Sequence, residues 1–131
     1  MVYKNIATAV FTPLEIGTVG LSEEEAITKY GEDMVDSYIS SFQPLEWSIA
    51  HKEVNSYAKI VYNRTDQTVL GLHIASPNAG EIIQGYAVAF RKGLNYNDLL
   101  NTVGIHPSTA EEFTTMEISK SSGGNFEKAG C

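Results

Sequence analysis

His106 and Glu111 are the residues whose types and spacing best fit acid-base chemistry. They lie in the segment Gly104-Ile105-His106-Pro107-Ser108-Thr109-Ala110-Glu111-Glu112-Phe113, a loop that leads into an expected helix. An imidazole exchanges protons near neutral pH, and a neighbouring carboxylate fixes its tautomer and supports its charged form. The surrounding residues supply no nucleophile, cofactor loop or metal ligands. The pair therefore resembles half of an active site, with the other half elsewhere.

The same residues also fit a purely structural role. Ser108-x-x-Glu111 and Thr109-x-x-Glu112 both match capping boxes, in which a hydroxyl and a carboxylate satisfy free backbone N–H groups at a helix start. Pro107 fits either interpretation, because proline is tolerated at the first helical position. His106 would then be an ordinary hydrogen-bonded loop histidine. On the local pattern, both interpretations stay open.

Length and charge limit the classes of partner. A chain of 131 residues is the size of one domain and can bury a proper core. Its formal charge of -7 and isoelectric point near 4.8 argue against a nucleic acid or an anionic membrane surface, since both need clustered Lys and Arg. No apolar run approaches the roughly 20 residues of a membrane span, and no secretory signal begins the sequence. We therefore expect no nucleic-acid partner and no membrane association.

Cysteine and histidine usage bears on compartment and metal binding. Cys131 is the only cysteine, so an internal disulfide is excluded. A chain without this staple fits a reducing compartment, and we expect a cytoplasmic protein, with a mitochondrial location as the alternative. His51 and His73 lack ligand-like spacing to His106 or Cys131. We therefore expect no metal site.

Hydrophobic alternation, turns and caps predict an antiparallel sheet with helices. Ser22-x-x-Glu25 begins a helix that ends at Tyr30-Gly31, because it forms a capping box with acidic residues at the positive end of the helix dipole. Asn78 caps a longer helix that ends at Arg91-Lys92-Gly93. The expected strands cover Ala7–Phe11, Ile16–Leu21, Met34–Phe42, Tyr57–Tyr62 and Val69–Ala75, the last three in a meander.

The remaining segments complete the expected fold. Pro44-Leu45-Glu46-Trp47 reads as a loop or bend with an aromatic anchor. We expect a short helix from Asn95 to about Thr102 and a last helix from Thr109 to about Ser119. Beyond Lys120 the Ser-Ser-Gly-Gly-Asn run cannot bury enough apolar area to offset its ordering entropy, which predicts a mobile tail. The order of elements indicates an α+β fold, an antiparallel β-meander sheet packed with helices.

Several short motifs follow one another along nearly the whole chain. They are Phe11-Thr12-Pro13-Leu14-Glu15, Gly20-Leu21-Ser22-Glu23-Glu24-Glu25-Ala26, Pro44-Leu45-Glu46-Trp47, Gly71-Leu72-His73, Pro77-Asn78-Ala79-Gly80-Glu81-Ile82-Ile83-Gln84-Gly85 and Gly104-Ile105-His106-Pro107. Each alone is weak, but the combination closely resembles the C-terminal dimerisation domain of animal-type thioredoxin reductases and thioredoxin-glutathione reductases. These enzymes belong to the pyridine nucleotide-disulfide oxidoreductases, and the fold expected is that of their FAD/NAD-linked dimerisation domains.

The resemblance implies the interface domain of a homodimeric enzyme that depends on FAD and NADPH. In this family electrons pass from NADPH to FAD, to a disulfide beside the flavin and then to the partner subunit's mobile tail, which reduces thioredoxin. The parts that bind FAD and NADPH are missing from this sequence. The resemblance thus implies that the chain binds neither cofactor and is inactive without the remainder of the reductase. Residues 1–120 match the dimerisation domain and residues 121–131 the flexible redox tail.

The resemblance also assigns roles to single residues. His106 matches the family's catalytic histidine and Glu111 its orienting carboxylate, so the pair would move a proton at a thiol of the partner's flavin-proximal disulfide. His106 and Pro107 would contact the partner subunit's FAD, and the matching peptide bond before Pro107 is cis. Cys131 matches the cysteine that precedes selenocysteine and a final glycine. The tail is therefore selenoprotein-like and is expected to be truncated after Cys131.

Two other interpretations remain. Glutathione reductase shares the general domain but lacks such a redox extension, so Ala129-Gly130-Cys131 favours thioredoxin reductase. A non-catalytic acidic binding module could share the fold without a redox role. That interpretation leaves the coincidence of His106 and Cys131 unexplained.

Overall fold

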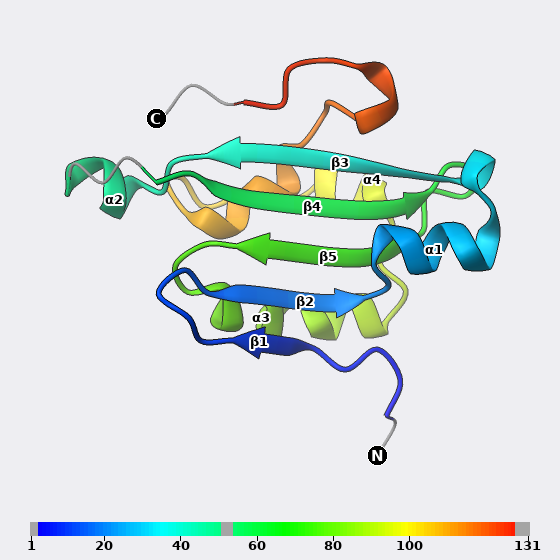
Figure 1. The fold of residues 1–131 in the computed structure, drawn as a ribbon, viewed down its shortest axis with the longest axis horizontal. Helices are drawn as coiled ribbons and strands as arrows, with labels where there is room; N and C mark the ends of the chain where they lie inside the picture. Colours follow the sequence, from blue (N-terminus) through cyan, green and yellow to red (C-terminus); the bar gives the residue numbers. More distant parts are fainter. Residues whose placement is uncertain (1–2, 51–53, 128–131) are drawn as a thin grey trace.

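Within residues 3–50 and 54–127, which the computed structural model describes, five strands form one antiparallel sheet. They are β1 (Thr8–Val10), β2 (Ile16–Gly20), β3 (Val35–Phe42), β4 (Ser56–Asn63) and β5 (Val69–Ala75). Their order across the sheet is β1-β2-β5-β4-β3, so β3, β4 and β5 form a meander and β2 lies on the other side of β5 (Figure 1). The predicted α+β fold is confirmed.

The meander follows from alternation and turn chemistry. Ala58 and Ile60 of β4 point into the main core, whereas Tyr57 is exposed. In the turn between β4 and β5, the Asn63 side chain accepts the N–H of Thr65 at 2.8 Å. Such side-chain bonds replace the ladder bonds that the backbone loses where it reverses direction.

Three helical elements cover one face of the sheet and enclose the main core. They are α3 (Ala79–Arg91), α4 (Tyr96–Leu100) and the 3-10 helix η2 (Thr109–Thr114). Ile83 and Phe90 of α3 are buried against the sheet. Tyr96 of α4 stacks on Tyr38 of β3 with ring centroids 4.2 Å apart. Aromatic stacking thus joins α4 to β3, which is an edge strand of the sheet.

The opposite face carries α1 (Glu23–Tyr30), which lies in front of the sheet in Figure 1. Ser22 and Glu25 form the predicted capping box at its start. Ala26 packs in a second, smaller cluster with Val35 and Val61. A 3-10 helix, η1 (Glu32–Met34), then leads into β3. The expected extended conformation at Met34 is therefore wrong, and β3 begins one residue later.

Two local expectations need correction. The segment expected to be a loop at Pro44–Trp47 contains a short helix, α2 (Leu45–Ile49). The carbonyl of Pro44 accepts the N–H groups of Trp47 and Ser48 at 2.9 and 3.0 Å. A helix can begin here because proline is tolerated at a helix start and no helix breaker follows it. Asn78 does begin α3, but in a left-handed conformation and without a side-chain cap bond. The Glu15 carboxylate instead accepts the Gly80 N–H at 3.3 Å.

The prediction of a last helix from Thr109 to about Ser119 is also wrong in its length. The helix is the shorter 3-10 helix η2, which ends at Thr114. The hydroxyls of Thr114 and Thr115 donate to the carbonyl of Glu111 at 2.8 and 3.3 Å, in competition with backbone bonds that would continue the helix. The chain then runs to a bridge between Ser119 and Tyr38 and to the 3-10 helix η3 (Lys120–Ser122).

Candidate functional site

The loop before η2 holds His106 against Glu111. The His106–Pro107 peptide bond is cis, as predicted. His106 Nδ1 lies 3.0 Å from Glu111 Oε1, the imidazole being 67% exposed and the carboxylate 13%. A shielded acceptor thus orients a ring that faces outward. When Nδ1 donates to the carboxylate, Nε2 carries the lone pair and can accept a proton.

Glu111 also caps η2. The same side chain thus serves as the helix cap and as the hydrogen-bond partner of His106. Its Oε1 accepts the backbone N–H of Ser108 at 3.1 Å, and its own N–H donates to the Ser108 hydroxyl at 3.3 Å. Thr109-x-x-Glu112 does not form the second expected box, because Thr109 already lies inside η2. The Glu112 carboxylate instead accepts the Ser40 hydroxyl of β3 at 2.7 Å.

Helix α3 and the core fix the position of η2. Phe113 is fully buried and meets Tyr86 of α3 edge to face, with ring centroids 5.0 Å apart. The Tyr86 hydroxyl donates to the carbonyl of Ala110 at 3.0 Å. Burial raises the pKa of Tyr86, which keeps this hydroxyl a donor. The position of Glu111 is therefore set by contacts with α3 as well as by the local capping box.

Gly104 allows the loop to approach η2 closely. A Cβ built at this position would lie 2.6 Å from Glu111 Cβ and 3.0 Å from Thr114 Oγ1. Real Cβ atoms essentially never make the shorter of these contacts. A side chain here would push the His106 loop away from the carboxylate that orients it.

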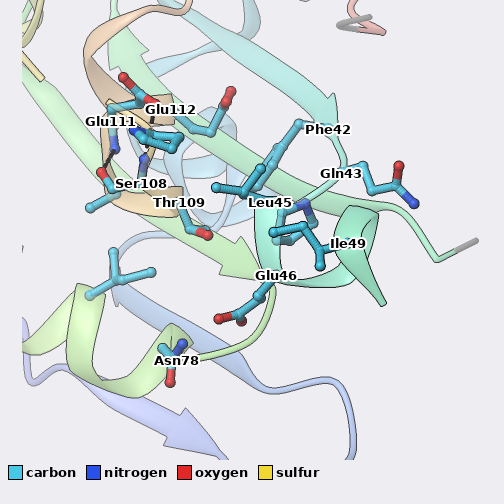
Figure 2. Close-up of a pocket in the computed structure, with 14 residues that line it drawn as sticks. Phe42, Gln43, Leu45, Glu46, Ile49, Asn78, Ser108, Thr109, Glu111 and Glu112 are labelled. Carbon is cyan, nitrogen blue, oxygen red and sulfur yellow. Dashed lines mark hydrogen bonds between the residues drawn. The ribbon is translucent and has the colours of Figure 1, made fainter. Parts of the chain in front are cut away.

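A cavity of about 420 Å³ opens beside the same segment. Figure 2 shows Thr109 and Glu112 on one side and Leu45 and Ile49 of α2 on the other. Glu111 also lines this cavity. The cavity thus combines an apolar wall from α2 with the carboxylates of η2.

Apolar side chains flank His106 at the surface. Val103 is 94% exposed and Ile105 is 81% exposed. Contiguous exposed apolar surface usually marks an interaction site. The imidazole therefore lies on a surface suited to a contact with another protein surface.

Comparison with known proteins identifies this domain. The model of the pyridine nucleotide-disulphide oxidoreductase dimerisation domain matches residues 6–117. The chain belongs to this family. It is 50% identical over 133 residues to thioredoxin reductase SEP1 of Emiliania huxleyi, which covers 100% of this chain and 27% of the relative. The crystal structure of LpdA from Mycobacterium tuberculosis superposes with a TM-score of 0.70 at 25% identity, over 88% of this chain and 25% of LpdA.

The chain spans 27% of its thioredoxin reductase relative. Its fold and family are those the sequence predicted. The structure brings His106 and Glu111 together, whereas their roles in a reaction stay predictions.

Other predicted positions lie elsewhere. Cys131 and His51 fall outside the described residues. The Nε2 atom of His73 in β5 lies 2.9 Å from the carbonyl oxygen of Leu21. Burial lowers the pKa of His73, which favours a neutral histidine packed in the fold. In the described part of the chain, no three His, Cys, Asp or Glu side chains are placed to hold a metal ion. No helix there is long and apolar enough to cross a membrane.

Sequence reasoning missed the residues that support the pair. Gly104 stands in the sequence only as part of a motif, and no local pattern indicates the bond from Tyr86 to Ala110. Ser40 carried no signal, because its partner Glu112 lies 72 residues away in the chain. A small residue next to a motif histidine is the one local signal that identifies Gly104 as a close-approach position.

Proposed function

We propose that this chain is the interface domain of an FAD- and NADPH-dependent thioredoxin reductase that acts as a homodimer. In this proposal His106 and Glu111 complete an active site whose disulfide and flavin belong to the partner subunit. The observation that carries it is the exposed imidazole, oriented through Nδ1 by a shielded carboxylate. The 50% identity to a thioredoxin reductase supports thioredoxin, rather than glutathione, as the substrate.

The proposed chemistry is a proton transfer during thiol–disulfide exchange. The thiolate is the attacking species, so a thiol of the partner's reduced pair must lose its proton before it attacks the oxidised tail, in which the resemblance pairs Cys131 with a following selenocysteine that is not among the 131 residues. His106 Nε2 accepts that proton, and Glu111 stabilises the resulting imidazolium. As the partner's sulfur bonds to the selenium, the bond between selenium and Cys131 breaks, and His106 returns the proton to the leaving Cys131 thiolate. Cys131 is the tail cysteine in this proposal.

The residues of this chain fit an edge contact with a flavin held by the partner. Bound FAD would supply the two electrons that reduce the disulfide beside it. Val103, Ile105 and His106 present an apolar surface with one polar ring, which fits such an edge. Gly17 lines no phosphate site, because a Cβ there would lie 2.6 Å from the Ala79 carbonyl oxygen, so α3 fills the space beside it. We therefore propose that His106 and Pro107 contact the cofactor without binding it alone.

The experiment compares His106→Ala with the unchanged full-length reductase. We expect the rate of thioredoxin reduction with NADPH to fall about 10²–10⁴-fold, the usual loss of a general acid-base group. Rapid mixing with NADPH should still reduce the flavin at the normal rate, because that step precedes the proton transfer. His73→Gln is the matched control, since His73 lies inside the sheet. Full thioredoxin reduction by His106→Ala would overturn the proposal.

A further inference from the structure

The end of the described chain runs along the open edge of the sheet. β3 has β4 on one side only. On its other side, Ser119 forms a bridge with Tyr38, and the N–H of Ser41 donates to the carbonyl of Phe126 at 3.0 Å. In Figure 1 this last segment, coloured orange to red, lies above β3. Residues 119–127 thus cover an edge that would otherwise expose unpaired backbone groups.

Glu23 holds Lys120, the second residue of this segment. It is the first residue of α1, and its carboxylate is only 10% exposed. Lys120 Nζ lies 2.7 Å from Glu23 Oε1, and Lys59 of β4 pairs with the other carboxylate oxygen. One shielded carboxylate therefore links α1, the sheet and the C-terminal segment.

Asp36 of β3 holds the next residue. Its side chain is 5% exposed and accepts the N–H of Ser121 at 3.3 Å, together with the Ser121 hydroxyl. Arg64 Nη2 lies 3.4 Å from the same carboxylate and balances its charge. Asp36 and Glu23 come from sequence positions some 85 to 97 residues before their C-terminal partners. Two independent carboxylates thus converge on consecutive residues.

The chain changes direction immediately after these contacts. Gly123 has a φ of +67°, a conformation that side chains disfavour. A Cβ at Gly124 would lie 2.8 Å from Ile118 Cγ2. The path after Ser122 therefore favours glycine at both positions, which places a flexible pair directly beyond the two held residues.

We propose that Glu23 and Asp36 are positioning residues that anchor the root of the redox tail, defined as Lys120–Ser122. The inference rests on the proposed function. With the root held, and once the bond between the Ser41 N–H and the Phe126 carbonyl opens, the residues beyond Ser122 set the reach of the tail toward the partner's disulfide, at most about 3.6 Å for each residue. Release of the root would free the chain from Lys120 onward, directly after the Ser119–Tyr38 bridge, and lengthen the tether. A longer tether lowers the effective concentration of the tail at its target.

The first test measures hydrogen exchange in the full-length protein without NADPH. We compare the unchanged protein with Lys120→Met combined with Ser121→Ala, a pair that alters the root and leaves the sheet intact. The peptide covering residues 117–127 should exchange about tenfold faster in the double variant, the size expected for lost hydrogen bonds to charged groups. Lys92→Met, at the exposed end of α3, is the matched control. Equal protection in the double variant, or exchange at the free-peptide rate in the unchanged protein, would overturn the anchor.

A second measurement tests the effect on the reaction. Thioredoxin reduction by the double variant should have a kcat lowered severalfold with an unchanged KM for NADPH, because only the internal transfer to the tail is affected. Lys120→Arg alone should keep the normal kcat, since it keeps the charge that pairs with Glu23. An unchanged kcat would overturn the positioning role. The exchange result does not depend on His106, so failure of the anchor and failure of the proposed function are distinguishable.

Discussion

At the scale of single residues, one carboxylate oxygen both orients the histidine and caps the helix. Glu111 Oε1 accepts both the His106 ring and the Ser108 backbone N–H. A cap and an orienting acceptor are therefore the same atom, and the geometry of the helix start is transmitted to the imidazole. Substitutions at Glu111 can separate the hydrogen bonds from the charge.

Glu111→Gln should lower thioredoxin reduction on the order of tenfold with little change in stability. The amide oxygen can still accept both hydrogen bonds, whereas the charge that supports an imidazolium is lost. Glu111→Ala should also cost about 1 kcal/mol of unfolding free energy, because the cap is removed. Steady-state kinetics and urea unfolding of both variants measure the two effects. Identical behaviour of the two variants would show that charge and cap are not separable.

Gly104→Ala should destabilise the protein by about 1–3 kcal/mol and lower activity. The new Cβ would lie 2.6 Å from Glu111 Cβ, so the loop or η2 must move. Gly85→Ala is the matched control, because Gly85 lies in α3 with open space around its Cβ. Helix propensity predicts that the control is neutral or stabilising. Equal thermal denaturation of the two variants would contradict the close-approach role of Gly104.

At the scale of elements, η2 depends on α3. Tyr86→Phe removes the donor to Ala110 and leaves that carbonyl without this bond. We expect a loss of about 1 kcal/mol of unfolding free energy and a lower thioredoxin reductase rate. Tyr57→Phe, on an exposed position of β4, should change neither quantity. A normal rate in Tyr86→Phe would mean that the capping box alone positions Glu111.

The sequence predicts elements well where local chemistry decides them. Residues Val69–Ala75 form β5 with the expected bounds, and the Ser22 box begins α1. Local patterns failed where distant residues compete. The expected last helix ends early, with Ser119 paired to Tyr38 some 80 residues before it. Lys120 and Ser121 contact Glu23 and Asp36, whereas the mobility of the tail stays a prediction. The motif predicted His106 and Glu111, but the supporting bonds from Tyr86 and Ser40 span too much sequence to be inferred.

At the scale of the whole molecule, two shielded carboxylates connect α1, the sheet and the C-terminal segment. Burial alone would raise the pKa of Glu23, but the hydrogen bonds from Lys120 and Lys59 outweigh it and lower the pKa. Burial opposes ionisation of Asp36 as well, yet the bonds from Ser121 and Ser37 and the charge of Arg64 lower its pKa. Both groups therefore favour the folded state when ionised.

This arrangement predicts a specific loss of stability in acid. Because the folded pKa values lie below the unfolded ones, the contribution is complete above the ordinary carboxyl pKa values of about 4 and is lost as pH falls from there through the lower folded values. Urea unfolding between pH 7 and pH 3 should show this loss. Asp36→Asn should make the unfolding free energy fall less steeply with decreasing pH. Asp33→Asn, on the exposed η1 nearby, is the control. A variant with the same acid profile as the unchanged protein would contradict the assignment to Asp36.

The central claim is that His106 acts on the disulfide of the other subunit. Its most direct test mixes two inactive forms of the full-length reductase, one with His106→Ala and one without the flavin-proximal cysteine pair, after dissociation and reassociation. Random pairing into twofold dimers should restore about a quarter of the normal thioredoxin reductase activity, since mixed dimers contain one complete site. No recovery, despite mixed dimers detected by mass spectrometry, would contradict a site shared between subunits.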